Sequence, residues 1–201
     1  MQKKQDQIDV TVDPKRMRIL EGALKVFLAY GYTRTTMDDI ARAADVSRPA
    51  LYLLFKNKTD IYRAIGSCLL ARSVSEARKA LEDEGPFGPR VMEALDRALF
   101  RLLERIQDSP HGEEILDIKN SLAADILANW RAELAEALTQ AVAREAAERS
   151  VSLEKRGLSA AALADILLDG LQGLKARGIW GRDAVANMRQ IIIVIEFALR
   201  P

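Results

Sequence analysis

The sequence predicts an all-α fold. From Pro14 onward, apolar residues recur three and four positions apart in nearly every window, which is the spacing of one helix face. No stretch alternates polar and apolar residues as a half-buried strand does. The chain has 201 residues, of which 49% are hydrophobic and 29% charged. With 11 Gly and 6 Pro, this composition excludes a disordered or collagen-like chain and allows a sizeable core.

The first predicted helix has clear start and stop signals. Asp13 is suited to cap it, Pro14 fits the first helical position, and Gly31 ends it. The polar residues 1–13 are expected to form a disordered N-terminal arm, in which Lys3 and Lys4 are either inert or lie over a partner.

The other helices are predicted from the same helical spacing and from the Gly and Pro residues that interrupt it. A run of Gly and Pro at residues 85–89 is the clearest break in the chain. Before it, helices are expected at residues 36–44, 48–55 and 59–82. After it, helices are expected at residues 90–107, 121–149, 159–176 and 183–199. We find no internal repeat of solenoid length.

The two short helices are joined by only about three residues, and this spacing predicts a helix-turn-helix motif. Ala41 supplies the small side chain that the crossing point needs. Asp45 occupies the turn position that favours positive φ, which Asp tolerates at moderate cost. Ser47 is placed to cap the second helix, whose first turn accepts Pro49. Apolar neighbours close the motif: Ile40, Ala44, Val46 and Leu51.

Two readings of this motif are open on spacing alone: two packed helices of a bundle, or a DNA reader. Residue types at fixed positions favour the second: Ile19, Ala23, Phe27, Gly31, Tyr32, Thr35, Thr36, Ile40, Ala41, Ala44, Asp45, Val46, Ser47, Leu51, Tyr52, Phe55, Lys56 and Lys58. With this set, residues 15–65 resemble the N-terminal domain of the TetR family of bacterial transcriptional regulators. The resemblance implies a three-helix DNA-binding domain over 14–58 and a larger helical effector-binding and dimerisation domain over 59–201.

The sequence departs from the family pattern at four positions. Asp45 stands where the family favours Gly, and Pro49 and Ala50 stand where it favours Gly and Thr. Leu54 replaces the usual His or Tyr and so removes a polar group that approaches the DNA backbone in the family.

Groove chemistry assigns expected roles to the candidate DNA contacts. The second short helix fits the major groove, where Arg48 is expected to read guanine O6 and N7, and Pro49 and Ala50 to pack on thymine methyls. Phosphate contacts are expected from Thr35 and Thr36 with free helix N-terminal amides and, by the resemblance, from Tyr52, Lys56 and Lys58. Ser47 is the remaining candidate DNA contact. Alternatively, the two lysines are solvated helix-end charges and Tyr52 borders the core.

One such reader contacts only a few base pairs, so useful specificity requires two of them. The last predicted helix is apolar almost all round, more than one core-facing side requires. The helix predicted before it, over residues 159–176, contains Gly170 and Gly173, which allow another helix to approach closely. The resemblance therefore implies a homodimer through residues 159–199. The alternative is a central helix that is fully buried within a monomer.

The resemblance also implies a small-molecule pocket within residues 59–149, whose ligand weakens DNA binding through the long helix after the reader. The candidate lining residues are Phe100, Leu103, His111, Asn120, Leu127 and Trp130. For three of these residues, a structural role without a ligand contact is the alternative. Trp130 fits an ordinary core, His111 an exposed loop, and Asn120 a helix cap. The mainly apolar lining favours an apolar ligand.

Several other classes of protein are disfavoured. A single Cys and a single His exclude a disulfide framework and a zinc cage and leave only carboxylate sites open to a metal. No segment reaches the ~20 apolar residues of a membrane helix and the N-terminus has no signal peptide, so we expect a cytoplasmic protein. The net charge is +1, with the basic excess in the first 60 residues.

No phosphate loop, nucleophile elbow or metal motif indicates an enzyme, and no cofactor is expected. Asp38 and Asp39 are better explained as first-turn acids that favour a helix N-terminus. The sequence therefore favours a ligand-responsive DNA-binding regulator that acts on a palindromic operator. Repression is the default, and activation stays open. The competing hypothesis is a helical protein-interaction adaptor without a DNA role.

Overall fold

The computed structural model describes residues 13–115, 122–179 and 181–201, and within these ranges every regular element is helical. The prediction of an all-α fold is confirmed. The helices are α1 (Pro14–Tyr30), α2 (Met37–Ala43), α3 (Arg48–Leu54), α4 (Lys58–Glu82), α5 (Phe87–Leu95), the π-helical η1 (Asp96–Phe100), α6 (Arg101–Gln107), α8 (Ala124–Glu148), the 3-10 turn η2 (Glu154–Arg156), α9 (Ala160–Ala176) and α10 (Gly181–Ala198).

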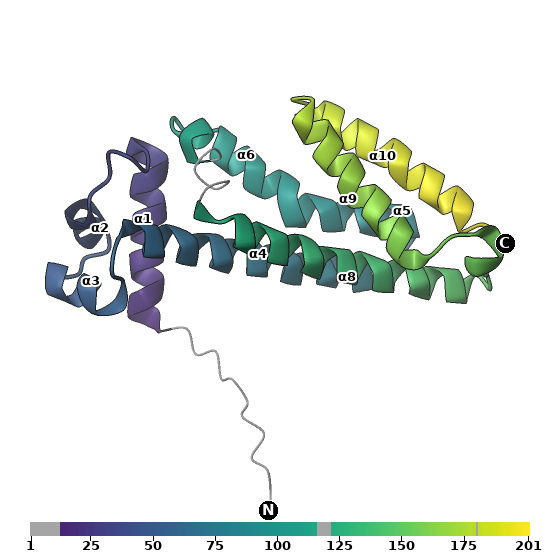
Figure 1. Cartoon of the computed structure of the whole chain (residues 1–201), viewed down its shortest axis with the longest axis horizontal. Helices are drawn as coiled ribbons and strands as arrows, with labels where there is room; N and C mark the ends of the chain where they lie inside the picture. The colour runs from purple at the N-terminus through teal and green to yellow at the C-terminus, as the bar shows by residue number, and fades with distance from the viewer. Residues whose placement is uncertain (1–12, 116–121, 180) are drawn as a thin grey trace, which may run out of the picture.

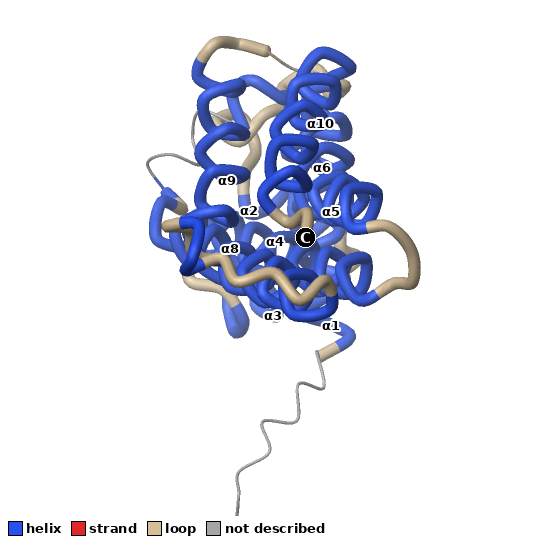
Figure 2. Tube along the Cα trace, turned by 90° about the vertical axis from the view of Figure 1, so that its right-hand side faces the viewer, coloured by secondary structure: helices blue, strands red, loops and turns tan. Residues whose placement is uncertain are grey.

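The helices form two groups that share α4 (Figure 1). At one end, α1, α2 and α3 gather around the start of α4. The long helices α4 and α8 run side by side away from this group, and α9 packs on α8. In a view turned by 90° about the vertical axis, α9 and α10 stand as neighbouring columns above α4 and α8 (Figure 2).

Each group has its own hydrophobic core. The core around α1–α3 contains Ile19, Phe27, Ile40 and Leu51, and it also takes in Ile61 and Ile65 from the first turns of α4. The larger core contains Phe87, Leu95, Leu134, Leu167 and Met188. Because α4 contributes to both cores, a shift of this helix is felt at both ends of the molecule.

Local side-chain caps start the helices of the first group. The Asp13 carboxylate accepts a hydrogen bond from the Lys15 amide (2.9 Å), and the Ser47 hydroxyl accepts one from the Ala50 amide (3.4 Å), so both predicted caps are confirmed. The Asn57 side chain, which the sequence reading did not single out, caps α4 by accepting from Asp60 (2.9 Å). Each cap satisfies an amide that lacks a helical partner.

The structure corrects the expected break at residues 85–89. Only residues 83–86 separate α4 from α5, because α5 begins at Phe87 and includes Gly88 and Pro89 in its first turn. Phe87 is fully buried, and the Gly88 amide donates to the Glu196 carboxylate (3.0 Å). Proline fits the first turn, where its missing N–H leaves no helical bond unmade.

The helix expected over residues 90–107 is also corrected. It is α5, a π-helical turn and α6 in succession, with the Arg101 amide donating to the Asp96 carbonyl. The π turn is an insertion of the kind often found at functional sites. The expected helix over 121–149 begins at Ala124 in the described residues.

Candidate nucleic-acid interface and effector cavity

The helix-turn-helix motif is formed as the sequence predicts. Asp45 adopts a positive φ of 51°, and the Val46 amide donates to the Ala41 carbonyl (3.0 Å), which closes the turn. Ala41 is buried, as its place at the crossing requires. An even closer approach involves Gly22 of α1, where a Cβ atom would lie 2.9 Å from the Ala44 backbone nitrogen. A lone glycine inside a helical pattern was the sequence signal for this contact.

One face of α3 is exposed at the end of the molecule (Figure 1). Leu51 is fully buried and anchors the helix, whereas Arg48, Pro49 and Tyr52 are exposed and Ala50 is half-buried. Arg48 is held from two sides. Its Nη1 atom lies 2.9 Å from Oδ2 of Asp38, and its guanidinium lies 5.6 Å from the Tyr52 ring centroid.

The two threonines of the α1–α2 connection form hydrogen bonds within the domain. Thr35 is only 3% exposed and its hydroxyl donates to the Gly31 carbonyl (2.6 Å), so this hydroxyl is already bonded within the fold, and its phosphate contact stays a prediction. Thr36 is exposed and forms a capping box with Asp39, in which the Thr36 amide donates to the Asp39 carboxylate (2.9 Å). The amide and the hydroxyl of Thr36 are therefore both bonded within this capping box. These bonds from Thr36 lower the pKa of Asp39.

The two lysines at the start of α4 are placed differently. The Lys58 Nζ donates to the carbonyls of Tyr32 (2.8 Å), Thr33 (3.1 Å) and Thr35 (3.0 Å), and lies 4.5 Å from the Tyr32 ring centroid. All three ammonium donors are thus used to hold the α1–α2 connection on α4. The phosphate contact expected of Lys58 stays a prediction, and it would compete with these three bonds. Lys56 is exposed, and its backbone amide donates to Asp60 (3.2 Å).

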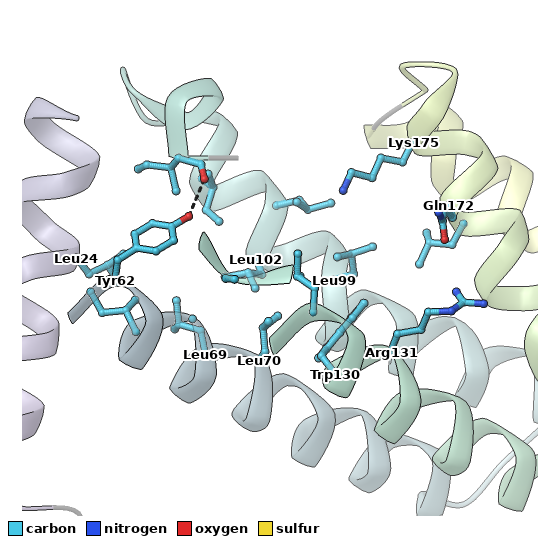
Figure 3. Close-up of a pocket in the computed structure, with 18 of the residues that line it drawn as sticks. Leu24, Tyr62, Leu69, Leu70, Leu99, Leu102, Trp130, Arg131, Gln172 and Lys175 are labelled. Carbon is cyan, nitrogen blue, oxygen red and sulfur yellow. Dashed lines mark hydrogen bonds between the residues drawn. The ribbon is translucent and has the colours of Figure 1, made fainter. Parts of the chain in front are cut away.

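A cavity of about 530 Å³ lies among α1, α4, α6, α8 and α9 (Figure 3). Its described wall is mostly apolar: Leu24, Phe27, Ile65, Gly66, Leu69, Leu70, Leu99, Leu102, Leu103, Ile106, Ile115, Ala123, Leu127, Trp130, Leu168, Leu171 and Ala176. The polar wall residues are Tyr62, Arg131, Gln172 and Lys175. Both the volume and the sparse polar groups are typical of small-molecule sites.

Residues 19–65 match the family described as bacterial regulatory proteins, tetR family. Residues 19–65 therefore carry the sequence of a tetR-family N-terminal domain. The HTH-type transcriptional regulator YhgD of Bacillus subtilis is 39% identical over 95 residues, which are 47% of this chain and 47% of that protein. The chain therefore spans less than half the length of this curated relative.

Solved TetR-family structures share the fold over nearly the whole chain. A TetR/AcrR-family regulator from Thermobifida fusca gives a TM-score of 0.65 at 20% identity, over 91% of this chain and 97% of that one. SmeT, the repressor of the Stenotrophomonas maltophilia multidrug efflux pump SmeDEF, gives 0.57 at 17% identity, over 91% and 89%. These likenesses extend the TetR fold to the residues beyond the family match.

The cavity wall contains three of the six predicted lining residues. Leu103, Leu127 and Trp130 line it. Phe100, the last residue of the π turn, packs against the larger core and is not among the residues that line the cavity. His111 lies outside the cavity wall, with its Nδ1 atom 3.8 Å from Glu114. Asn120 lies outside the described residues.

Sequence reasoning missed the contributions of α1, α4 and α9 to this wall. Tyr62 of α4 donates to the Ile115 carbonyl (2.8 Å), and its burial raises its pKa to about 12. The Trp130 indole donates to the Ser73 hydroxyl (3.0 Å). Apolar residues at helical spacing were the available signal, but they do not distinguish a cavity wall from a core.

Contacts near the cavity reach directly into the helix-turn-helix domain formed by α1, α2 and α3 (the reader domain). Phe27 of α1 lines the cavity, and its ring lies 5.4 Å from that of Tyr32, centroid to centroid. The Glu114 carboxylate accepts a hydrogen bond from the Thr33 amide (2.8 Å), and this bond lowers the pKa of Glu114. The wall of the cavity and the back of the reader are therefore one packed unit.

Two other kinds of site were searched for in the described part of the chain. Among those residues, no three His, Cys, Asp or Glu side chains are grouped so that they could bind a metal ion. No helix in the same ranges combines the length and apolar character that crossing a bilayer requires.

Proposed function

We propose that this chain is a ligand-responsive DNA-binding transcriptional repressor that leaves a palindromic operator when a mainly apolar small molecule fills the cavity. The single observation that carries the proposal is the position of α1. This helix supports the exposed reader helix α3 on one side and supplies Leu24 and Phe27 to the cavity wall on the other. Residues 14–58 would form the DNA-binding domain and residues 59–201 the effector and dimerisation domain.

The exposed residues of the reader divide into base contacts and phosphate contacts. Arg48, with Pro49 and Ala50, would meet base edges in the major groove. Tyr52 and Lys56, which border the same face, would meet phosphates and set the register. Asp38 enters this account as a positioning residue, because its carboxylate holds the Arg48 guanidinium before DNA arrives.

A second copy of the chain would supply the second reader. Val194 and Phe197 of α10 are 66% and 53% exposed, and Ile166 of α9 and Ile193 of α10 extend the same apolar surface. The opposite side of α10 is buried, so the alternative of a last helix enclosed on all sides within one chain is wrong. An apolar face on two adjacent helices fits an isologous four-helix interface through residues 159–199.

Ligand and DNA would compete through two states of the same assembly. If a ligand binds better to the state in which the two readers are wrongly spaced, each partner weakens the binding of the other by the same factor. The long α4, which contributes to both cores, is the element that carries the change. Because its proposed partner is DNA, the chain would act in the cytoplasm.

The test begins with selection of genomic fragments bound by the purified chain, followed by binding titrations on the selected site and on random DNA. We expect a palindromic preference and a steep loss of affinity with added salt. Absence of binding at low salt would favour the adaptor hypothesis instead. A reporter gene behind the selected site then distinguishes repression from activation.

The variant Arg48→Ala tests the base-reading role. We expect it to cost about 1–3 kcal/mol of operator binding and to flatten the preference for operator over random DNA. The matched control is Arg72→Ala, which removes an exposed arginine from α4, away from the reader helix. Equal losses of Arg48→Ala on both DNAs would remove Arg48 from this role.

A further inference from the structure

Three of the four polar side chains of the cavity wall are gathered at one end. Arg131 of α8 and Gln172 and Lys175 of α9 lie together there, whereas Tyr62 and Leu24 lie at the opposite end (Figure 3). Gln172 and Lys175 belong to one face of α9, because the cavity residues on this helix follow helical spacing: Leu168, Leu171, Gln172, Lys175 and Ala176. The cavity is therefore polarised along its length.

The charges at this end are not equivalent. The Arg131 guanidinium lies 2.8 Å from Asp169 and 4.0 Å from Asp165, so its charge is already offset by two acids of α9. Lys175 has no ion pair within 4 Å among the described residues. Its side chain extends from α9 toward the cavity (Figure 3). Lys175 is thus the cation that this end of the cavity offers to a ligand.

The rest of the cavity wall offers a ligand little beyond apolar contact. The Tyr62 hydroxyl is already bonded to the Ile115 carbonyl, and the indole nitrogen of Trp130 to Ser73. On α4 the wall runs from Tyr62 to Leu70, about 12 Å at the helical rise per residue. Along this length the wall is built from leucine, isoleucine and aromatic side chains.

We propose that the cavity takes an amphiphile with one anionic head group, such as a carboxylate, on an unbranched apolar chain. The head group binds Lys175 and Gln172, and the chain runs between α4 and α8 toward Tyr62. Gln172 supplies an amide donor beside the ammonium, and Lys175 lies at the exposed mouth, so the head group keeps part of its hydration. This ligand class deepens the proposed function and rests on it.

Calorimetric titration of the purified full-length chain, without DNA, tests the class. The probes are decanoate, decanol and decylammonium, which share one chain and differ in head-group charge. We expect decanoate to bind about tenfold more tightly than decanol, as a charge-assisted hydrogen bond implies, and decylammonium to bind most weakly. Equal binding of decanoate and decanol, or no binding of either, would overturn the proposal.

Two variants of one residue make the test specific to this site. Lys175→Met keeps an unbranched apolar side chain and is expected to abolish the decanoate preference, and Lys175→Glu is expected to reverse it in favour of decylammonium. Lys155→Met is the control, because Lys155 is exposed on η2 and is not part of the cavity wall. An unchanged decanoate preference in Lys175→Met would overturn the assignment.

The two levels of the proposal fail separately. Ligand binding is measured without DNA, and DNA binding without ligand. Selective decanoate binding by a chain that does not bind DNA would leave the head-group site standing and refute the regulator. DNA binding by a chain that binds decanol as tightly as decanoate would leave the regulator standing and refute the head-group site.

Discussion

The reader domain and the cavity differ in how their polar groups are used. In the reader, hydroxyls, amides and ammonium donors are mostly bonded to neighbours within the domain, as in the Thr36–Asp39 capping box and the Lys58 contacts to three carbonyls. In the cavity, the wall is apolar and its charged groups stand at one end. The reader is thus rigid and preorganised, whereas the cavity is defined mainly by shape and by one local charge.

The strongest way to break the reader without touching its exposed face is Gly22→Ala. The new Cβ would lie 2.9 Å from the Ala44 nitrogen, and backbone cannot yield as a flexible side chain does. We expect a loss of about 1–3 kcal/mol in the free energy of unfolding, measured by urea titration. Gly66→Ala in α4 is the control, because a Cβ there meets nothing within 4 Å, and it should be neutral or stabilising.

Lys58→Met separates a structural lysine from a DNA-binding one. Its loss leaves three carbonyls without their ammonium donor, so we expect the free energy of unfolding to fall by about 1–3 kcal/mol. Lys56→Met should leave stability unchanged and reduce the salt dependence of DNA binding by about one phosphate contact. Lys58→Met with unchanged stability and the same reduced salt dependence would restore Lys58 as a phosphate contact.

Glu114→Ala tests the contact that joins the two regions. Without the carboxylate, the Thr33 amide loses its acceptor and should exchange with solvent about tenfold faster, as measured by hydrogen exchange. Glu113→Ala, one residue away and exposed, is the control. Because the pKa of Glu114 is lowered in the fold, the protection should be full above the ordinary pKa of a glutamate and fade as the pH falls through the lowered value.

The smallest expected effect comes from the Arg63–Asp125 pair, which joins α4 to α8 with two hydrogen bonds of 2.8 and 2.6 Å. Arg63 lowers the pKa of Asp125 to about 2 from 3.8, so the pair adds stability above about pH 4 and loses it as the pH falls toward 2. Asp125→Asn should lower the urea midpoint slightly at pH 7, and the difference from the parent chain should shrink in acid.

A control for this pair is Asp108→Asn, which changes an exposed aspartate in the turn after α6. It should leave the urea midpoint unchanged at both pH values. A difference between Asp125→Asn and the parent chain that persists undiminished at pH 2 would show that the ion pair is not its cause.

Sequence reasoning succeeded where the deciding interactions are local. Asp13, Ser47 and Asp45 act on backbone within three residues, so their roles at helix starts and in the turn could be predicted. It failed where partners are distant. Lys58 meets carbonyls more than 20 residues away, and no local pattern distinguishes this from a solvated charge.

The cavity was harder to predict for the same physical reason. Its wall draws residues from five helices, and each of them is also a plausible core residue when read alone. The π turn adds a further difficulty, because it shifts the phase of α6 relative to α5 and so changes which side chains point inward. Phe100 was misassigned and Leu99 was missed at this turn.

The double placement of Phe27 constrains how the sequence can change. It is a fully buried member of the reader's core and at the same time part of the cavity wall. Any mutation at this position alters the fit of the small molecule and the support of the DNA-reading helix together. Under the proposed function, a lineage that adapts to a new effector through α1 would change its operator affinity at the same step, whereas changes confined to α9 would leave that affinity unaltered.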